Sequence, residues 1–168
     1  MRPVRLEDAA DLARIYRENR VFTAPFDPPR TESFFTEEGQ RIELEQAIAQ
    51  AAMGARMRHV ILDGDQIIGA LAISNIVRGP FQSGNLGYWV TQEHNGRGVA
   101  TRAVGLAIQS AFAEHGMHRL EAGTLLDNVA SQRVLRKNGF KEIGIAPRYL
   151  FIGGDWRDHL LFQRLSDD

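Results

Sequence analysis

A strand, a glycine-bearing turn and the first turn of a helix follow one another in residues 87–101. Residues 88–90 (Tyr-Trp-Val) have the aromatic and β-branched character of a strand. Gly96 and Gly98 allow backbone N–H groups to turn toward one point and allow a ligand to approach closely. The helix that begins there adds free N–H groups and the positive end of its dipole. The stretch therefore predicts a site for phosphate or pyrophosphate.

This turn differs from two common phosphate-binding patterns. A lysine-containing phosphate loop needs Gly-Lys-Ser/Thr at the helix start, whereas this chain has Gly98-Val99-Ala100. A dinucleotide fingerprint follows the first strand of a parallel unit and has an acidic residue about twenty positions later. Glu121 lies at such a distance, but three strand-like segments precede the turn. Taken alone, the glycines are equally compatible with an ordinary strand–helix connection.

A second helix carries polar residues close to this turn. We predict a helix at residues 100–114, a strand at 119–125, and a helix from Asn128 to a stop at Asn138-Gly139. Asn128, Ser131 and Leu135 have the spacing that places residues on one helix face. An amide and a hydroxyl on one stripe suit a ligand that carries amide groups and a thiol. The alternative is that Asn128 only caps the helix and Ser131 faces solvent.

The remaining segments complete a mixed sheet. They are a short strand from Val4, a helix at 8–16, an aromatic–proline loop at 22–35, a helix at 37–53, a hairpin of 59–62 and 66–77, and late strands near 140–145, 149–152 and 159–164. Antiparallel strands with one strand–helix–strand crossover predict an α/β fold with a mixed α+β sheet. No repeat or linker interrupts residues 1–168, so we predict a single domain.

The sequence also resembles a known enzyme superfamily. Residues 95–100 (Asn-Gly-Arg-Gly-Val-Ala) are similar to the Q/R-x-x-G-x-G/A signature of the Gcn5-related N-acetyltransferases (GNAT), with Asn95 in the usual Gln/Arg position. Residues 128–140 resemble the N-x-x-[AS]…G-F segment of that superfamily. Further segments resemble its ribosomal-protein-alanine (RimJ/RimL-like) type, namely 23–30, 118–120, Ser131, 149–150 and 154–159.

The resemblance implies a twisted, mostly antiparallel sheet with a central splay, flanked by helices on both faces. It implies acetyl-CoA as the acyl donor, with pantetheine amides paired to the backbone of Val90 and Thr91 and with phosphates on the glycine turn. The residues expected to bind the cofactor are Val90, Thr91, Asn95, Gly96, Arg97, Gly98, Val99, Ala100, Thr101, Asn128, Ser131 and Lys137.

The resemblance also identifies a missing group. Many members have a tyrosine seven residues after the asparagine, which protonates the departing thiolate, but this position is Leu135. Ser131 is the replacement candidate, or it forms a simple hydrogen bond to pantetheine. Tyr149 could serve as the acid or hold the amine, or it could be an ordinary rim tyrosine. Glu121 could be the base or a surface carboxylate.

The absence of cysteine limits the mechanism. It excludes a disulfide, a cysteine metal site and a cysteine nucleophile. The five histidines show no metal-binding spacing, so we expect no metal. We therefore expect the amine to attack the thioester directly within one ternary complex.

Composition indicates where such a protein acts. The formal charge of −1 gives no electrostatic reason to expect direct binding of nucleic acid. No apolar run approaches the length of a membrane span, and we expect no membrane partner and no signal peptide. These features predict a cytoplasmic protein, either a monomer or a homodimer.

Three functions remain open at this level. The first is an acetyltransferase for protein N-termini, in which the segment at residues 22–30 grips the peptide. The second is an acetyltransferase for a small amine or antibiotic. The third is a non-catalytic acyl-CoA-binding module, which the missing tyrosine would permit.

Overall fold

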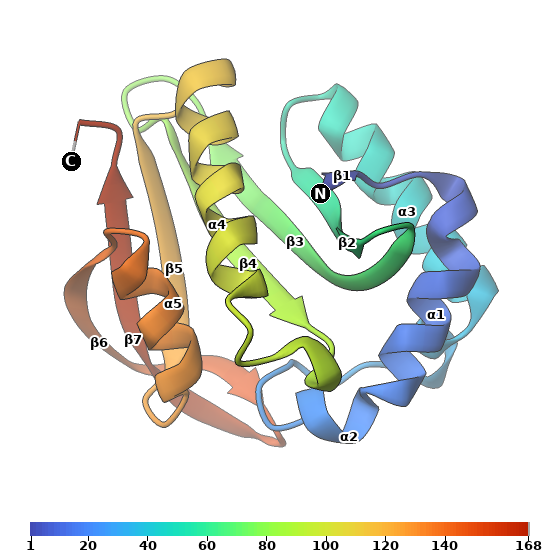
Figure 1. Cartoon of the computed structure of the whole chain (residues 1–168). Helices are drawn as coiled ribbons and strands as arrows, with labels where there is room; N and C mark the ends of the chain where they lie inside the picture. Colours follow the sequence, from blue (N-terminus) through green and yellow to red (C-terminus); the bar gives the residue numbers. More distant parts are fainter. Residues whose placement is uncertain (168) are drawn as a thin grey trace.

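A mixed β-sheet with helices on both faces forms the framework of the chain (Figure 1). The structure is a computed structural model that describes residues 1–167. Its strands are β1 (Arg2–Pro3), β2 (Met57–Asp63), β3 (Gln66–Val77), β4 (Ser83–Val90), β5 (Arg119–Leu125), β6 (Lys141–Ile152) and β7 (Asp155–Leu165). Its α-helices are α1 (Ala9–Glu18), α2 (Arg20–Thr23), α3 (Glu37–Ala52), α4 (Val99–Gln109) and α5 (Val129–Lys137). Short helical turns are η1 (Leu6–Asp8), η2 (Glu32–Phe35), η3 (Gln92–His94) and η4 (Ser110–Glu114).

The sheet has the strand order β1-β2-β3-β4-β5-β7-β6. Every neighbouring pair is antiparallel except β4 and β5, which are parallel and are joined through α4. This single crossover is the strand–helix–strand unit that the sequence predicts.

The sheet opens between β4 and β5. Their pairing covers three residue pairs and ends at Asn85 and Glu121, whereas β3 stays paired with β4 as far as Val90. The last five residues of β4 therefore have an edge that no β5 residue pairs with. We call this opening the splay, and both halves of the candidate site lie beside it.

Two hydrophobic cores lie on the two faces of the sheet. On one face, α4 and α5 pack on the strands through fully buried side chains that include Val104, Leu135 and Phe162. On the other face, α1 and α3 pack through Leu12 and Leu44, which are also fully buried. Burial of each such side chain contributes about 1.5–3 kcal/mol. The first core includes residues of both β4 and β5, whereas the second packs against β4 through Trp89.

The β2–β3 hairpin, β5 and the start of α3 agree with the predicted elements, and three predictions need correction. The short first strand is Arg2–Pro3 and ends before Val4. The helix predicted at 100–114 ends at Gln109 and continues as the π-helical turn η4, in which the His115 N–H donates to the Ser110 carbonyl. The loop predicted at 22–35 contains helical turns at both ends.

The late strands also differ from the prediction. The segments predicted at 140–145 and 149–152 form one strand, β6, with irregular register between Ala146 and Leu150. Pro147 lies in that interval, where a missing N–H does the least harm because β6 is an edge strand. The strand continues past the proline, with a shift in its register against β7.

Candidate active site

The turn after β4 presents backbone N–H groups at the start of α4. Gly96 and Gly98 have positive φ angles of 74° and 79°, and Gly98 is the residue from which α4 begins. A Cβ atom at either glycine would meet nothing within 4 Å, so the space outside the turn is open. Within residues 1–167 no side chain caps this helix, which leaves the first-turn N–H groups of Val99, Ala100 and Thr101 for a ligand. An anion fits there.

Asn95 holds this turn against the end of β4. Its Nδ2 donates to the carbonyl oxygens of Val90 at 3.1 Å and Thr91 at 3.2 Å. The side chain is therefore structural, and the N–H groups of the turn remain free to bind phosphate.

Cationic side chains surround the turn. Arg97 and Arg102 line a pocket of about 270 Å³ between the turn and β2, which His94 and Asp63 also line. Both guanidinium groups are exposed, and neither pairs with an acidic side chain in the described part of the chain. They add positive charge beside the helix start.

Lys137 is the last residue of α5. Its neighbour Asn138 donates through Nδ2 to the carbonyl oxygen of Thr101 at 3.1 Å, which ties the end of α5 to the first turn of α4. Lys137 is exposed at that junction. The sequence offered no direct sign of this contact, because it joins residues 37 positions apart.

The splay exposes the backbone of Val90 but not that of Thr91. The Thr91 N–H donates to the Ile68 carbonyl on β3 at 2.8 Å, so it is not available to pantetheine. Because N–H directions alternate along a strand, the Val90 N–H points the other way, toward the splay. The expected backbone contact is thus possible at Val90, and the structure argues against the amide of Thr91.

Two hydroxyl groups meet beside the splay. Tyr88 lies on the part of β4 that has no β5 partner, and its hydroxyl is 2.9 Å from Ser131 Oγ in the first turn of α5. Burial raises the pKa of the Tyr88 hydroxyl to about 12, although its hydrogen bond with Ser131 partly opposes this effect. Sequence reasoning identified Ser131 and missed Tyr88. The strand alternation that buries Leu86 and Val90 on the α5 face would have placed Tyr88 there too.

Asn128 caps α5, as the simpler of the two sequence interpretations states. Its Oδ1 accepts from the Ser131 N–H at 3.1 Å, which leaves its Nδ2 for a ligand. Leu135, which was placed on the same face, is fully buried in the core. The helix therefore brings Asn128 and Ser131 to the splay but turns Leu135 inward.

The opposite face of the sheet carries a second set of side chains. Trp89 points away from the hydroxyl pair and donates through Nε1 to the Tyr16 hydroxyl on α1 at 3.1 Å. Tyr16 in turn packs against Phe34, with ring centroids 4.8 Å apart. Gly87 lies on the same face as Trp89, and a Cβ there would meet nothing within 4 Å. This face is open where β4 leaves β5.

Tyr149 and His159 lie across that opening. A Cβ at Gly123 of β5 would lie 3.7 Å from the Tyr149 ring and 3.6 Å from the His159 ring. The two rings have centroids 5.5 Å apart, and His159 is almost fully buried, with Nδ1 3.0 Å from the Arg157 carbonyl. Tyr149 is 41% exposed, so a substrate that enters the opening can reach this side chain. His159 is a further residue that sequence reasoning missed.

Glu121 occupies a less favourable position. It lies on the face of β5 opposite Ser131, at the closed end of the splay, where it is the last residue paired with β4. Its carboxylate is 2.7 Å from Arg119 Nε, two residues farther from the opening. The structure therefore places Ser131 and Glu121 on opposite faces of the sheet and pairs Glu121 with Arg119.

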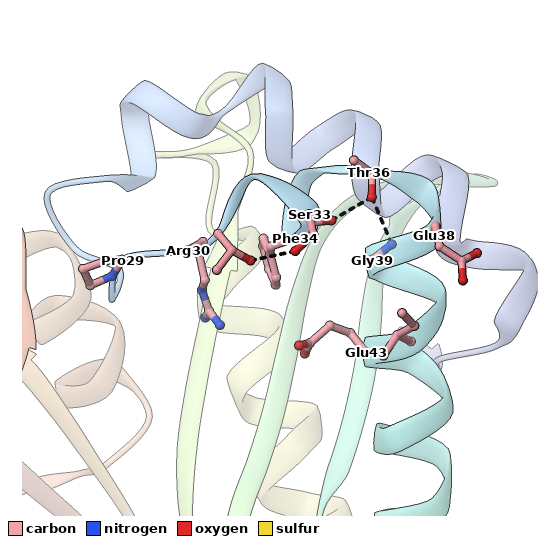
Figure 2. A pocket seen from close by; sticks show the side chains of 10 residues that line it. Pro29, Arg30, Ser33, Phe34, Thr36, Glu38, Gly39 and Glu43 are labelled. Atoms are coloured by element: carbon pink, nitrogen blue, oxygen red, sulfur yellow. Dashed lines mark hydrogen bonds between the residues drawn. The ribbon is translucent and has the colours of Figure 1, made fainter.

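A pocket of about 370 Å³ continues this face between residues 29–34 and the start of α3 (Figure 2). Phe34 forms part of its wall, and Arg30 stacks on the Phe34 ring at 4.6 Å. The side chains of Arg30 and Glu43 point toward the same space from opposite sides (Figure 2). Aromatic contacts thus connect this pocket with Trp89 through Phe34 and Tyr16.

Comparisons with known proteins agree with this geometry. A family model described as an acetyltransferase (GNAT) domain matches residues 1–141. The [ribosomal protein uS5]-alanine N-acetyltransferase of Escherichia coli is 36% identical over the whole chain, and the match covers 88% of that relative.

Solved structures agree as well. The ribosomal-protein-S5-alanine acetyltransferase of Vibrio fischeri superposes with a TM-score of 0.96 at 36% identity, over 99% of this chain and 92% of that one. Mycobacterium smegmatis RimJ in complex with CoA-disulfide has a TM-score of 0.96 at 32% identity, over 99% and 81% of the two chains. These matches confirm the predicted fold and the predicted acyl donor. No helix within residues 1–167 is long and apolar enough to cross a bilayer.

Proposed function

Because this chain belongs to the GNAT acetyltransferase family, we propose that it acetylates the N-terminal α-amino group of a ribosomal protein that begins with alanine. Acetyl-CoA is the donor. Two relatives that match over essentially the whole chain at 36% identity are alanine acetyltransferases of ribosomal protein uS5 or S5. We also propose a cytoplasmic location, because a ribosomal protein is the proposed acceptor.

The observation that carries the proposal is the division of the splay between two faces. One face presents the α4 turn and the Tyr88–Ser131 hydroxyl pair. The other presents open space at Gly87, bordered by Trp89 and Tyr149. A donor and an acceptor can therefore approach the same backbone segment from opposite sides and react in one complex.

Backbone and hydroxyl groups then supply the chemistry. The Val90 N–H is placed to donate to the carbonyl oxygen of the thioester as negative charge develops on it. Ser131 is placed to donate to the departing sulfur. In this proposal Tyr149 holds the attacking amine by accepting a hydrogen bond from it. Glu121 is the weakest of the candidates because Arg119 already binds its carboxylate.

An α-amine suits a site without a strong base. A peptide α-amine has a pKa of about 7.7–8.0, so roughly a tenth or more is neutral near pH 7, whereas an alkylamine with a pKa near 10.4 is neutral less than about one part in a thousand. Only the neutral amine attacks. A hydroxyl and a water molecule therefore suffice for an N-terminus but not for a lysine side chain.

The segment at residues 22–30 and the adjoining pocket are placed to contact the residues after the acceptor alanine. An ion pair between Arg20 and Glu32, with an N–O distance of 2.6 Å, ties the two ends of this segment together. Phe26 is 43% exposed there. This region is the part of the molecule that can select one protein N-terminus over another.

A thiol-release assay with matched acceptors tests the proposal. The panel contains a peptide with an N-terminal alanine, the same peptide with its N-terminus formylated and one lysine retained, and a set of small amines. We expect turnover of the free peptide alone, with kinetics of a ternary complex and no acetylated enzyme. A kcat/KM that is higher for a small amine than for every peptide would overturn the assignment of the acceptor.

A further inference from the structure

The Ser131 hydroxyl is held from two sides. Its own backbone N–H is bound by Asn128 Oδ1, which caps α5. Its Oγ lies 2.9 Å from the Tyr88 hydroxyl, which also lies 3.2 Å from the Ser131 carbonyl oxygen. The pair joins β4 to α5 across 43 residues of sequence, at the edge of the splay.

Each of the two hydroxyl groups has one proton to donate, and the hydrogen bonds of the pair depend on which atom receives each proton. If Tyr88 donates to the Ser131 carbonyl, the serine hydroxyl can donate to the tyrosine oxygen, and neither proton is left for a ligand. If Tyr88 donates to Ser131 Oγ, the serine proton is free for a third atom. Within residues 1–167 no other group accepts from Ser131 Oγ. A sulfur atom in the splay would be that third atom.

Leu135, the position of the usual tyrosine on this helix face, cannot take the role. Leu135, one turn farther along α5, has no polar atom and is fully buried. Ser131, in the first turn of α5, is the hydroxyl on this helix face that can donate to the leaving sulfur.

We propose that Tyr88 is a positioning residue that orients Ser131, so that the serine hydroxyl donates a hydrogen bond to the sulfur of the departing CoA thiolate. The inference requires acetyl transfer from CoA but does not depend on the identity of the acceptor. The nitrogen–carbon bond forms and the carbon–sulfur bond breaks, with its electron pair on sulfur. The neutral amine gains a positive charge on nitrogen as the bond forms, and the extra proton then leaves to solvent.

Both hydroxyl groups keep their protons in this step. The pKa of Tyr88 is about 12, because the hydroxyl is buried, whereas a free thiol has a pKa of about 8.5. Proton transfer from the tyrosine to the thiolate is therefore unfavourable by a factor of more than about 1,000. The pair stabilises the thiolate as a hydrogen-bond donor and is not consumed as an acid.

The test uses the protein with bound CoA and no acceptor. The fraction of bound CoA present as thiolate is followed against pH by its ultraviolet absorbance. Tyr88→Phe removes one oxygen and keeps the ring, and we expect about 3- to 10-fold less thiolate at a given pH than in the unsubstituted protein. Tyr16→Phe, which removes a hydroxyl on the other face, is the matched control and should leave this titration unchanged.

Turnover of acetyl-CoA provides the second readout. Tyr88→Phe should lower kcat about 3- to 10-fold with little change in the KM for acetyl-CoA. Because Tyr88 acts through Ser131, the double variant Tyr88→Phe/Ser131→Ala should match Ser131→Ala alone.

Two results would overturn the inference. One is an unchanged thiolate titration in a Tyr88→Phe protein that still binds CoA. The other is a double variant whose loss is the product of the two single losses, since Tyr88 would then act independently of Ser131. Failure of the proposed acceptor would leave the titration unaffected, so the two failures are distinguishable.

Discussion

The two faces of the sheet at the splay are built differently. The face covered by α4 and α5, which carries the glycine turn and the Tyr88–Ser131 pair, is called the donor face. Side-chain hydrogen bonds from Asn95 and Asn138 and the cap at Asn128 hold its elements together. The opposite face, which carries Trp89 and Tyr149, is called the acceptor face. The segment around α2 and the strand β6 beside it are largely exposed. Regions with few buried contacts open at low free energy.

The difference follows from what each face binds. Every turnover uses the same donor, so a rigid donor face can be shaped to one ligand. The acceptor face must admit the end of a protein chain and release it. β4 serves both faces through consecutive residues, since Tyr88 points to the donor face and Trp89 to the acceptor face.

A substitution in the glycine turn of the donor face should have the largest effect, which is a loss of affinity for CoA. Gly98→Val places a branched side chain where the phosphate must lie, in a backbone conformation that valine disfavours. We expect the affinity for CoA, measured by titration calorimetry, to fall about 100-fold or more. Gly54→Val is the matched control, because Gly54 has a similar φ of 68° and equally open surroundings but lies at the end of α3. A folded Gly98→Val protein with unchanged CoA affinity would contradict the assignment.

The next effect concerns the leaving group. Ser131→Ala removes a hydrogen bond to a developing anion, which is worth about 1.5–3 kcal/mol. We expect kcat to fall about 10- to 100-fold, with the KM for acetyl-CoA within about twofold. Near-normal turnover in this variant, together with a large loss in Tyr149→Phe, would move the leaving-group role to the acceptor face.

A third substitution tests whether the donor face can accept the usual tyrosine of the family. Leu135 is fully buried, so Leu135→Tyr adds volume and a hydroxyl to a filled core. We expect the free energy of unfolding to fall by about 1–3 kcal/mol, measured by denaturant titration, and kcat to gain nothing. A rise in kcat would mean that position 135 can reach the splay.

The smallest effect belongs to the acceptor face. Tyr149→Phe removes one exposed hydroxyl, worth about 0.5–1.5 kcal/mol if it binds the amine. We expect kcat/KM for the acceptor peptide to fall about 2- to 10-fold and CoA affinity to stay unchanged. A loss of CoA affinity would show that the two faces are not separate, and a shift in the pH–rate profile would identify Tyr149 as a titrating group.

Much of the donor face could be predicted from local sequence. The strand at residues 88–90, the turn at Gly96 and Gly98, and the cap at Asn128 all depend on the conformations of neighbouring residues. The enzyme interpretation was correct as well, and the family match favours it over a non-catalytic acyl-CoA-binding module. Ser131 remains a predicted catalytic residue, although the structure places it beside the splay as expected.

Other site residues could not be predicted in this way. The pattern of α5 places Leu135 beside Ser131, but the packing of α5 on the sheet turns it into the core. The sequence left Glu121 as a possible base, but in the structure its carboxylate pairs with Arg119, two residues earlier on the same face of β5. In both cases the neighbours in space decided the role.

The sequence by itself determined most of the order of elements and the glycine turn at the start of α4, because these depend on backbone conformation over a few residues. Its resemblance to the GNAT superfamily indicated acetyl-CoA. Only the tertiary structure decided which side chains meet. The Tyr88–Ser131 pair, the route from Trp89 through Tyr16 to Phe34, and the place of His159 beside Gly123 all join distant segments. Such contacts depend on strand register and helix packing, which the whole core sets at once.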